Sequence, residues 1–132
     1  MLNLKDGPSA LPIRRASAKD RLTRASSLFG SPLRTAILVA IRMLEDTYAS
    51  ELAALLDLNL YSVQRVLASL EADGVIAIRP LGRTRVVSLD PRYLGHGPLA
   101  SLLWELGAHD EALQRALAGR RRRPRRAGKP GL

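Results

Sequence analysis

The sequence predicts a mainly α-helical domain with one small β-hairpin and a helical extension on its C-terminal side. Three observations support this fold class. Apolar residues make up 46% of the 132-residue chain, a share that suits one compact domain. They recur at helical spacing in three successive segments between residues 32 and 73. A run of valine and isoleucine then follows, interrupted by a turn that contains glycine, and such a run is typical of a hairpin.

The first helix is expected at residues 32–45. Ser31 is a suitable N-cap, and Pro32 suits the first helical position because its ring already fixes a helical φ. One buried face is expected, formed by Leu33, Ile37, Ile41 and Leu44, with Leu38 beside them. Residues 1–27 mix glycine, proline and serine with scattered arginine and contain no sustained apolar period. They are therefore expected to form a flexible basic arm.

Two shorter helices are expected within residues 50–73. Ser50, followed by Glu51, is typical of a helix N-terminus, where a hydroxyl caps the helix and an acidic residue favours its dipole. After a short turn, Asn59 caps the second of these helices, and Gly74 ends it because glycine readily adopts the left-handed conformation. The side chains expected to face inward are Val63, Val66, Leu67 and Leu70.

The chain after this point predicts a hairpin and then more helix. The hairpin is expected at residues 75–89, with its turn at residues 81–83. Helical spacing returns at residues 98–118, where Gly107 leaves open whether one helix or two form. Residues 120–132 contain seven cations and almost nothing to bury, so a disordered basic tail is expected there.

Charge is distributed unevenly along the chain. Residues 1–30 carry six Lys/Arg and two Asp/Glu, a net charge of +4. Residues 31–119 carry eight Lys/Arg and ten Asp/Glu, a net charge of −2. Residues 120–132 carry seven Lys/Arg and no Asp/Glu, a net charge of +7, and the three segments together give the total of +9. A nearly neutral folded part with basic ends suits a polyanionic partner such as nucleic acid.

Two short helices joined by a tight turn, with a hairpin directly after them, form a winged helix-turn-helix, whose second helix lies in the major groove of DNA. Residues 28–91 resemble the ArsR-type winged-helix regulators. The resemblance lies in three segments: Ser50-Glu51-Leu52-Ala53, Ser62-Val63-Gln64-Arg65 and Leu70-Glu71-Ala72-Asp73-Gly74-Val75-Ile76. It implies that the third helix contacts bases, that the wing contacts phosphate or the minor groove, and that the terminal helices form a dimer.

The residues assigned to DNA by this resemblance have suitable chemistry. Gln64 can bond adenine and Arg65 can bond guanine, while the hydroxyls of Tyr61 and Ser62 can reach phosphates or base edges. Arg83 and Arg85 are expected to share one face of the wing as alternate strand residues. The predicted DNA-binding residues are Asn59, Tyr61, Ser62, Gln64, Arg65, Arg83, Arg85, Arg120, Arg121, Arg122 and Arg123.

Four segments are therefore expected: a flexible basic arm at 1–27, a winged helix-turn-helix DNA-binding domain at 28–92, a helical dimerisation segment at 93–119 and a basic disordered tail at 120–132. The third segment has more leucine than one helix usually needs to cover a small domain. Its predicted interface residues are Leu99, Leu102, Leu103, Trp104, Leu106 and Leu113. Trp104 falls on the side opposite the Leu99, Leu102 and Leu106 stripe, where it either meets a partner subunit or covers its own core.

Several classes of function are excluded or disfavoured. The chain has no cysteine, and His96 and His109 stand without supporting ligands, so neither a metal nor another cofactor is expected. No catalytic motif is present, and we expect that the protein is not an enzyme. No apolar run is long enough to span a membrane, and we expect a soluble cytoplasmic protein that associates with the nucleoid.

The sequence thus predicts a sequence-specific, double-stranded-DNA-binding transcriptional regulator, a repressor that acts as a homodimer. An alternative is a winged-helix adaptor that binds a protein partner without sequence-specific DNA binding. A third interpretation, RNA or ribosome binding by the basic ends, is disfavoured because aromatic residues are only 4% of the chain.

Overall fold

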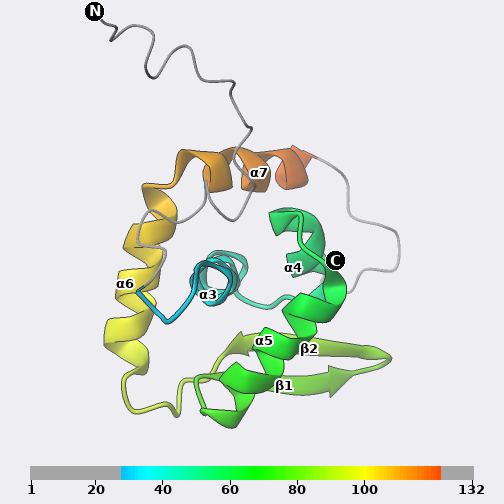
Figure 1. Ribbon diagram of the computed structural model, residues 1–132, viewed down its shortest axis with the longest axis vertical. Coiled ribbons are helices and arrows are strands. Elements are labelled where there is room, and N and C mark those ends of the chain that lie inside the picture. The colour runs from blue at the N-terminus through cyan, green and yellow to red at the C-terminus, as the bar shows by residue number, and fades with distance from the viewer. Residues whose placement is uncertain (1–27, 123–132) are drawn as a thin grey trace, which may run out of the picture.

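The computed structural model of the chain describes residues 28–122, in which five helices and a two-stranded antiparallel sheet are arranged around one core (Figure 1). The predicted fold class, mainly helical with a small hairpin in a winged helix-turn-helix, is confirmed. The elements are α3 (Pro32–Leu44), α4 (Ala49–Leu56), α5 (Leu60–Ala72), β1 (Ile76–Leu81), β2 (Thr84–Leu89), α6 (His96–Ala108) and α7 (Glu111–Arg122).

Helix α3 occupies the centre of the molecule, and the other helices surround it (Figure 1). Ser31 caps it as predicted, because its Oγ accepts a hydrogen bond from the Arg34 amide at 3.0 Å. The expectation of a single buried face is wrong, since every residue from Thr35 to Ile41 is buried. A helix that is apolar all round is a core helix, and α3 takes that place because α4, α5, α6 and α7 cover its different sides.

Helix α4 begins at Ala49, and the prediction that Ser50 caps it is wrong. Its N-cap is Tyr48, which forms no side-chain capping bond. The start is set by the preceding residue: the Thr47 amide donates to the Val87 carbonyl at 3.0 Å, and the Val87 amide donates back at 2.7 Å. Because this pairing holds the backbone extended as far as Tyr48, the helix turns only after it, and Ser50 lies exposed in the first turn.

Helix α5 has the boundaries that its sequence predicts. Asn59 caps it, with Oδ1 accepting from the Ser62 amide at 3.2 Å. Gly74 follows its end with a φ of 81°, which is the left-handed conformation expected there. Val63, Leu67 and Leu70 are fully buried, and Val66 is partly buried.

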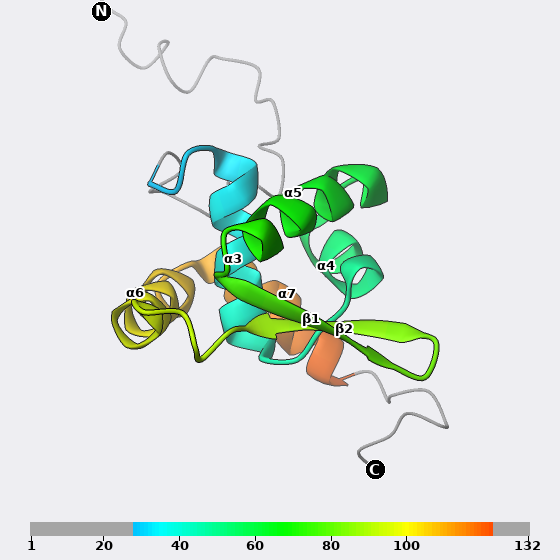
Figure 2. The same ribbon diagram turned by 90° about the horizontal axis from the view of Figure 1, so that it is seen from below.

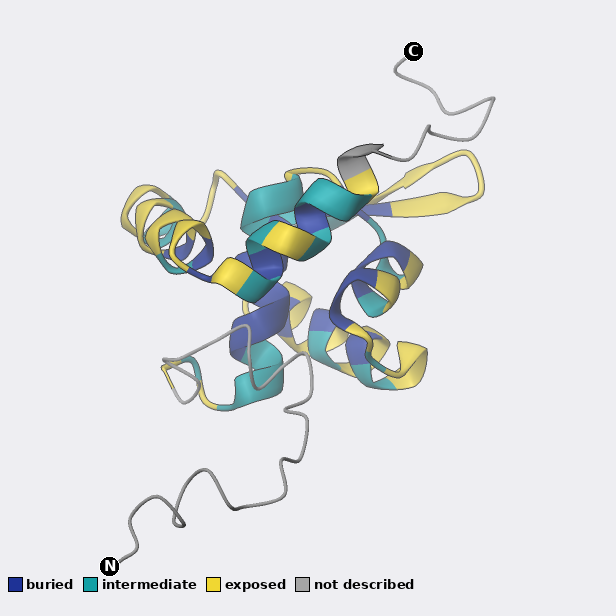
Figure 3. Cartoon of the chain, turned by 90° about the horizontal axis from the view of Figure 1, so that it is seen from above, coloured by how far each residue is buried: buried dark blue, intermediate teal, exposed yellow. Residues whose placement is uncertain are grey.

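The hairpin pairs Ile76 with Leu89 and Leu81 with Thr84, so its loop consists of Gly82 and Arg83. Gly82 has a φ of 64°, as a tight two-residue turn requires. The base of the hairpin is buried while its tip is exposed, and the tip projects beyond the helices (Figures 2 and 3).

Residues 96–122 form two helices, which answers the question that the sequence left open. The break lies at His109 and Asp110, whose Oδ1 accepts from the Leu113 amide at 3.0 Å and caps α7. Gly107 is not the break. It lies within α6 against α3, where a Cβ would be only 2.7 Å from Met43 Sδ.

One hydrophobic core joins all of these elements. It includes Ile37 and Ile41 of α3, Leu52 of α4, Leu70 of α5 and Ile76 of β1. Leu103, Leu113 and Leu117 belong to the same cluster, so α6 and α7 complete the core of the winged part. No helix within residues 28–122 is both long and apolar enough to cross a membrane.

Candidate nucleic-acid interface

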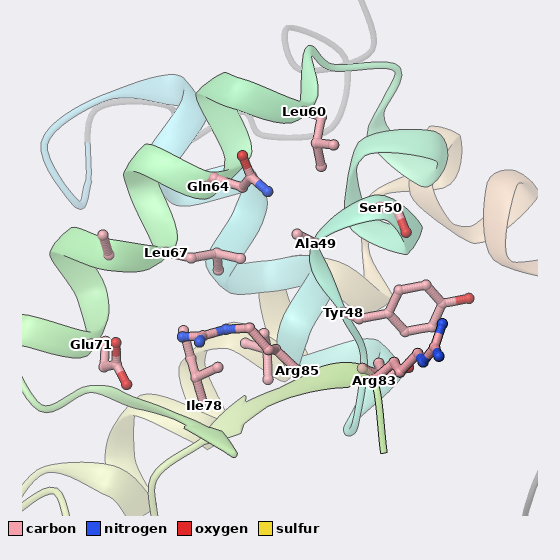
Figure 4. A pocket seen from close by; sticks show the side chains of 13 residues that line it. Tyr48, Ala49, Ser50, Leu60, Gln64, Leu67, Glu71, Ile78, Arg83 and Arg85 are labelled. Atoms are coloured by element: carbon pink, nitrogen blue, oxygen red, sulfur yellow. The ribbon is translucent and has the colours of Figure 1, made fainter. Parts of the chain in front are cut away.

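The hairpin, α5 and the start of α4 enclose an open cleft of about 550 Å³, here called the α5–hairpin cleft (Figure 4). It brings together residues that are far apart in sequence. Its lining residues are Tyr48, Ala49, Ser50, Leu60, Gln64, Leu67, Ala68, Glu71, Ile78, Arg83, Thr84, Arg85 and Val87.

Three predicted DNA-binding residues line this cleft: Gln64, Arg83 and Arg85. All three are exposed, whereas Leu67 and Val87 are buried and close the cleft from below. Gln64 points from α5 into the cleft (Figure 4). The cleft therefore has an apolar base and a polar, positively charged rim.

The two wing arginines do not share one strand face, which corrects the sequence interpretation. Arg83 is the second residue of the hairpin loop, and β2 begins only at Thr84. Figure 4 shows Arg85 reaching across the cleft toward the side of Glu71, whereas Arg83 lies near Tyr48. The two guanidinium groups thus lie toward opposite ends of the cleft.

The predicted residues on α5 lie on different sides of the helix, because successive side chains are about 100° apart. Gln64 faces the cleft together with Leu60 and Glu71. Tyr61 and Arg65 lie on the outer side, where the Arg65 guanidinium carbon is 5.8 Å from the centre of the Tyr61 ring. Tyr61 is 65% exposed, so this stack is open to a ligand.

Asn59 and Ser62 are less available than the sequence suggested. The Asn59 side-chain oxygen is used to cap α5 through the Ser62 amide. Ser62 is only partly exposed, and helical spacing places it on the same side as Ser69, whose hydroxyl accepts a bond from Arg34 of α3 at 2.8 Å. The side of α5 that carries Ser62 therefore lies toward α3 and away from the cleft.

Several arginines are already paired with carboxylates. Arg34 contacts Asp73 at 2.7 Å, Arg79 contacts Asp46 at 3.6 Å, and Arg92 contacts Asp90 at 3.0 Å. Arg65, Arg83 and Arg85 form no ion pair with any described carboxylate. The positive charge that the described fold leaves unneutralised near α5 and the hairpin is therefore concentrated at the cleft and on the outer side of α5.

Asp90 fixes the chain where it leaves the hairpin. Its Oδ1 accepts from the Arg92 amide at 2.9 Å and from Arg92 Nε at 3.1 Å, and its Oδ2 accepts from Arg92 Nη2 at 3.0 Å. The hydrogen bonds from the Arg92 side chain, and then that from its backbone, lower the pKa of the Asp90 carboxyl below its ordinary value.

Arg120, which the sequence assigned to the DNA-binding tail, lies in α7 and is bound to the protein itself. Its Nη2 donates to Glu51 Oε2 at 2.5 Å, and the Glu51 side chain is only 5% exposed. The ion pair neutralises the charge of Arg120 within the protein, and its contact with DNA stays a prediction. Arg121 and Arg122 end α7, and Arg123 lies outside the described residues.

The residues assigned to a dimer interface fall into three groups. Leu103 and Leu113 are buried in the chain's own core, so neither presents a surface to a partner. Leu99 and Leu106 are partly buried and pack against that core. Leu102 and Trp104 are 42% and 45% exposed, and the Arg42 guanidinium lies 5.1 Å from the centre of the Trp104 ring.

The two histidines lie apart from any ligand cluster. His96 begins α6, while His109 follows its end, with Nδ1 2.9 Å from the Glu105 carbonyl oxygen. Within residues 28–122 no group of three or more potential ligands is close enough to hold a metal ion.

Sequence reasoning missed several residues of this region. Tyr48, Leu60 and Glu71 line the cleft, and Thr47 and Glu51 are joined by a 2.7 Å hydrogen bond beside it. The last pair gave no recognisable sequence signal, because a capping box has its threonine at the N-cap, whereas Thr47 precedes the N-cap Tyr48.

Comparisons with known proteins support the fold. No model of a known protein family matches the chain, and no curated protein sequence matches it significantly. Among solved structures, the oxidised form of MarR from E. coli is similar, with a TM-score of 0.52 and 19% identity over 77% of this chain and 73% of that one. A mutant of MarR from E. coli is similar too, with a TM-score of 0.51 and 20% identity over 77% of this chain and 72% of that one. These likenesses support a winged helix-turn-helix and leave the ArsR-type assignment a prediction.

Proposed function

We propose that this chain is a sequence-specific, double-stranded-DNA-binding transcriptional regulator. The observation that carries the proposal is the α5–hairpin cleft, which is lined by Gln64 of α5 and by Arg83 and Arg85 of the hairpin. A winged helix-turn-helix places its second helix in the major groove, and α5 has the corresponding position in this fold.

The residues divide into base readers and backbone contacts. Gln64 on the cleft side and Arg65 on the outer side of α5 suit adenine and guanine edges, respectively. Arg83 at the hairpin tip and Arg85 beside it suit the phosphates of the strand that borders the groove. The cleft between the two elements gives that strand a place to lie, with positive charge from the hairpin and without a described carboxylate pairing that charge.

We further propose that the protein acts as a homodimer and represses by occupying its site. One helix reads only a few base pairs, whereas a two-fold dimer doubles the site and places two reading helices about one DNA turn apart. Of the residues assigned to the interface, Leu102 and Trp104 on α6 are exposed and therefore available for a partner subunit. The basic residues from 121 onward add phosphate contacts, and a repressor of this kind works in the cytoplasm, on the nucleoid.

Selection from random duplexes tests the function. The full chain should enrich a common palindromic motif and bind it at least about 10³-fold tighter than a scrambled duplex. Equal affinity for all duplexes would contradict sequence specificity and show that the protein binds DNA non-specifically. The absence of duplex binding, together with capture of a defined protein partner that depends on Tyr61 or Trp104, would establish the adaptor alternative instead.

Sedimentation tests the dimer. The wild type should sediment as a dimer at micromolar concentration, and Trp104→Lys should give a folded monomer because it would bury a second cation beside Arg42 at the interface. Ser101→Lys, a change at an exposed polar residue of the same helix, is the matched control. A wild type that is monomeric both alone and on DNA contradicts the dimer.

A further inference from the structure

The ion pair between Arg120 and Glu51 has a buried carboxylate and joins residues that are 69 positions apart, whereas the other buried carboxylate in an ion pair, Asp90, bonds Arg92 two positions away. The Glu51 side chain is 5% exposed, whereas the carboxylates that pair with Arg34 and Arg79 are 57% and 64% exposed. A carboxylate removed from water is costly unless it is paired and hydrogen-bonded. This contact is therefore part of the interior of the protein.

The Glu51 carboxylate joins three elements. Its residue lies in the first turn of α4, and its Oε2 accepts from Arg120 at the end of α7. Its Oε1 accepts from the Thr47 hydroxyl at 2.7 Å. Thr47 in turn exchanges two backbone hydrogen bonds with Val87 of the hairpin. One carboxylate thus holds α4, α7 and the residue that fixes the hairpin.

These contacts border the α5–hairpin cleft. Ala49 and Ser50, just before Glu51, line the cleft at the α4 side, and Val87 lines it at the hairpin side. The position of the hairpin relative to the start of α4, both of which border the cleft, therefore depends on the Thr47 contacts. A small displacement there would shift Arg83 and Arg85 relative to Gln64.

We propose that Glu51 and Arg120 are positioning residues for DNA recognition, which set the geometry of the α5–hairpin cleft through Thr47. This inference rests on the proposed function, because DNA discrimination reports that geometry. The pair also fixes the end of α7 beside the first turn of α4.

A double-mutant cycle in the full chain tests the pair: Arg120→Met, Glu51→Gln and both changes together. Arg120→Met should lower Tm by about 10 °C or more, because it leaves a buried unpaired carboxylate. The double variant should regain most of this loss. Arg115→Met is the matched control: this arginine also lies on α7, is exposed and has no ion pair with a described carboxylate. Its Tm should stay within about 3 °C of the wild type.

DNA discrimination provides a readout that a merely structural role would not change. It is the ratio of Kd values for a scrambled and a selected duplex, measured where circular dichroism shows the variants to be folded. In the double variant this ratio should fall at least about fivefold, which is the effect expected when one base contact is weakened. The slope of log affinity against log salt should stay unchanged, since the Arg120 charge is already neutralised by Glu51.

The outcomes separate the possibilities. If Arg120→Met keeps the wild-type Tm and lowers the salt slope by about one, Arg120 is a phosphate contact and the proposal is overturned. A folded double variant with wild-type discrimination overturns it as well. If Arg120→Met does not fold, the DNA discrimination of Glu51→Gln and of the double variant still tests the proposal. A wild type that binds no duplex refutes the proposed function and the positioning role together, whereas the Tm cycle still tests the ion pair.

Discussion

The α5–hairpin cleft and the junction between α7 and α4 use arginine in opposite ways. At the cleft, Arg83 and Arg85 are exposed and form no ion pair with a described carboxylate. At the junction, Arg120 is bound to a buried carboxylate. The comparison shows that an arginine's charge can be paired within the fold, and that a run of basic residues in the sequence does not reveal which arginines are paired.

The comparison also explains why the sequence placed Arg120 in a free tail. In sequence it is the first of four consecutive arginines, so composition assigns it to a basic tail. In the structure, α7 continues to Arg122, and its last turns bring Arg120 over α4. Arg120 thus belongs to the folded core, and we predict that any basic tail with a separate role begins after it.

The largest expected effect comes from moving that boundary. Truncation after Arg120 should weaken binding to every duplex and flatten the salt slope by up to about five, because six cations no longer displace counterions. The Tm should change little. Truncation after Gly119 should give the same DNA result and a much lower Tm, because it also removes the partner of Glu51. Equal Tm values for the two truncations would contradict the boundary.

A second comparison lies within α5. Gln64→Ala and Arg65→Ala should each cost about 1–3 kcal/mol at a selected duplex and much less at a scrambled one, because base contacts carry sequence preference. Ala72→Ser, at an exposed position in the last turn of α5, is the control, because base contacts come from the first turns of such a helix. An equal loss on both duplexes would show that α5 does not read bases.

The hairpin should give the complementary pattern. Arg83→Gln and Arg85→Gln should each reduce the salt slope by about one and weaken both duplexes equally, as phosphate contacts do. Arg79→Gln is the matched control, since Arg79 lies on the same hairpin but is 3.6 Å from Asp46 and does not line the cleft. If all three variants behave alike, the cleft has no special role in binding.

Much of the fold could be predicted because local signals agree with the tertiary structure. The caps at Ser31 and Asn59, the left-handed Gly74 and the two-residue hairpin loop with Gly82 depend on nearby residues only. The start of α4 could not be predicted, because it depends on pairing between Thr47 and Val87, 40 residues apart. Leu103 was assigned to an interface for a similar reason: apolar spacing does not distinguish the chain's own core from a partner.

The candidate site was predictable in part. The types of residue on α5 and the hairpin indicated DNA contact, and Gln64, Arg83 and Arg85 do meet in one cleft. Whether a given side chain is free to contact a ligand could not be predicted, because the capping bond of Asn59 and the ion pair of Arg120 depend on partners that only the fold supplies.

The smallest expected effect concerns the ion pair between Asp90, whose side chain is only 11% exposed, and Arg92, whose side chain is exposed. Because the folded state lowers the pKa of Asp90, the unfolded chain takes up this proton at higher pH than the native protein does. The stabilisation is thus fully present above the unfolded pKa and is lost as the pH falls through the folded value. Asp90→Asn should therefore lower Tm slightly at neutral pH, with a difference from the wild type that narrows in acid. The Arg92 side chain is 86% exposed, which keeps the effect small through solvent screening. A Tm difference between the wild type and Asp90→Asn that widens toward low pH would contradict this prediction, because it would show that the ionised Asp90 carboxylate does not stabilise the fold.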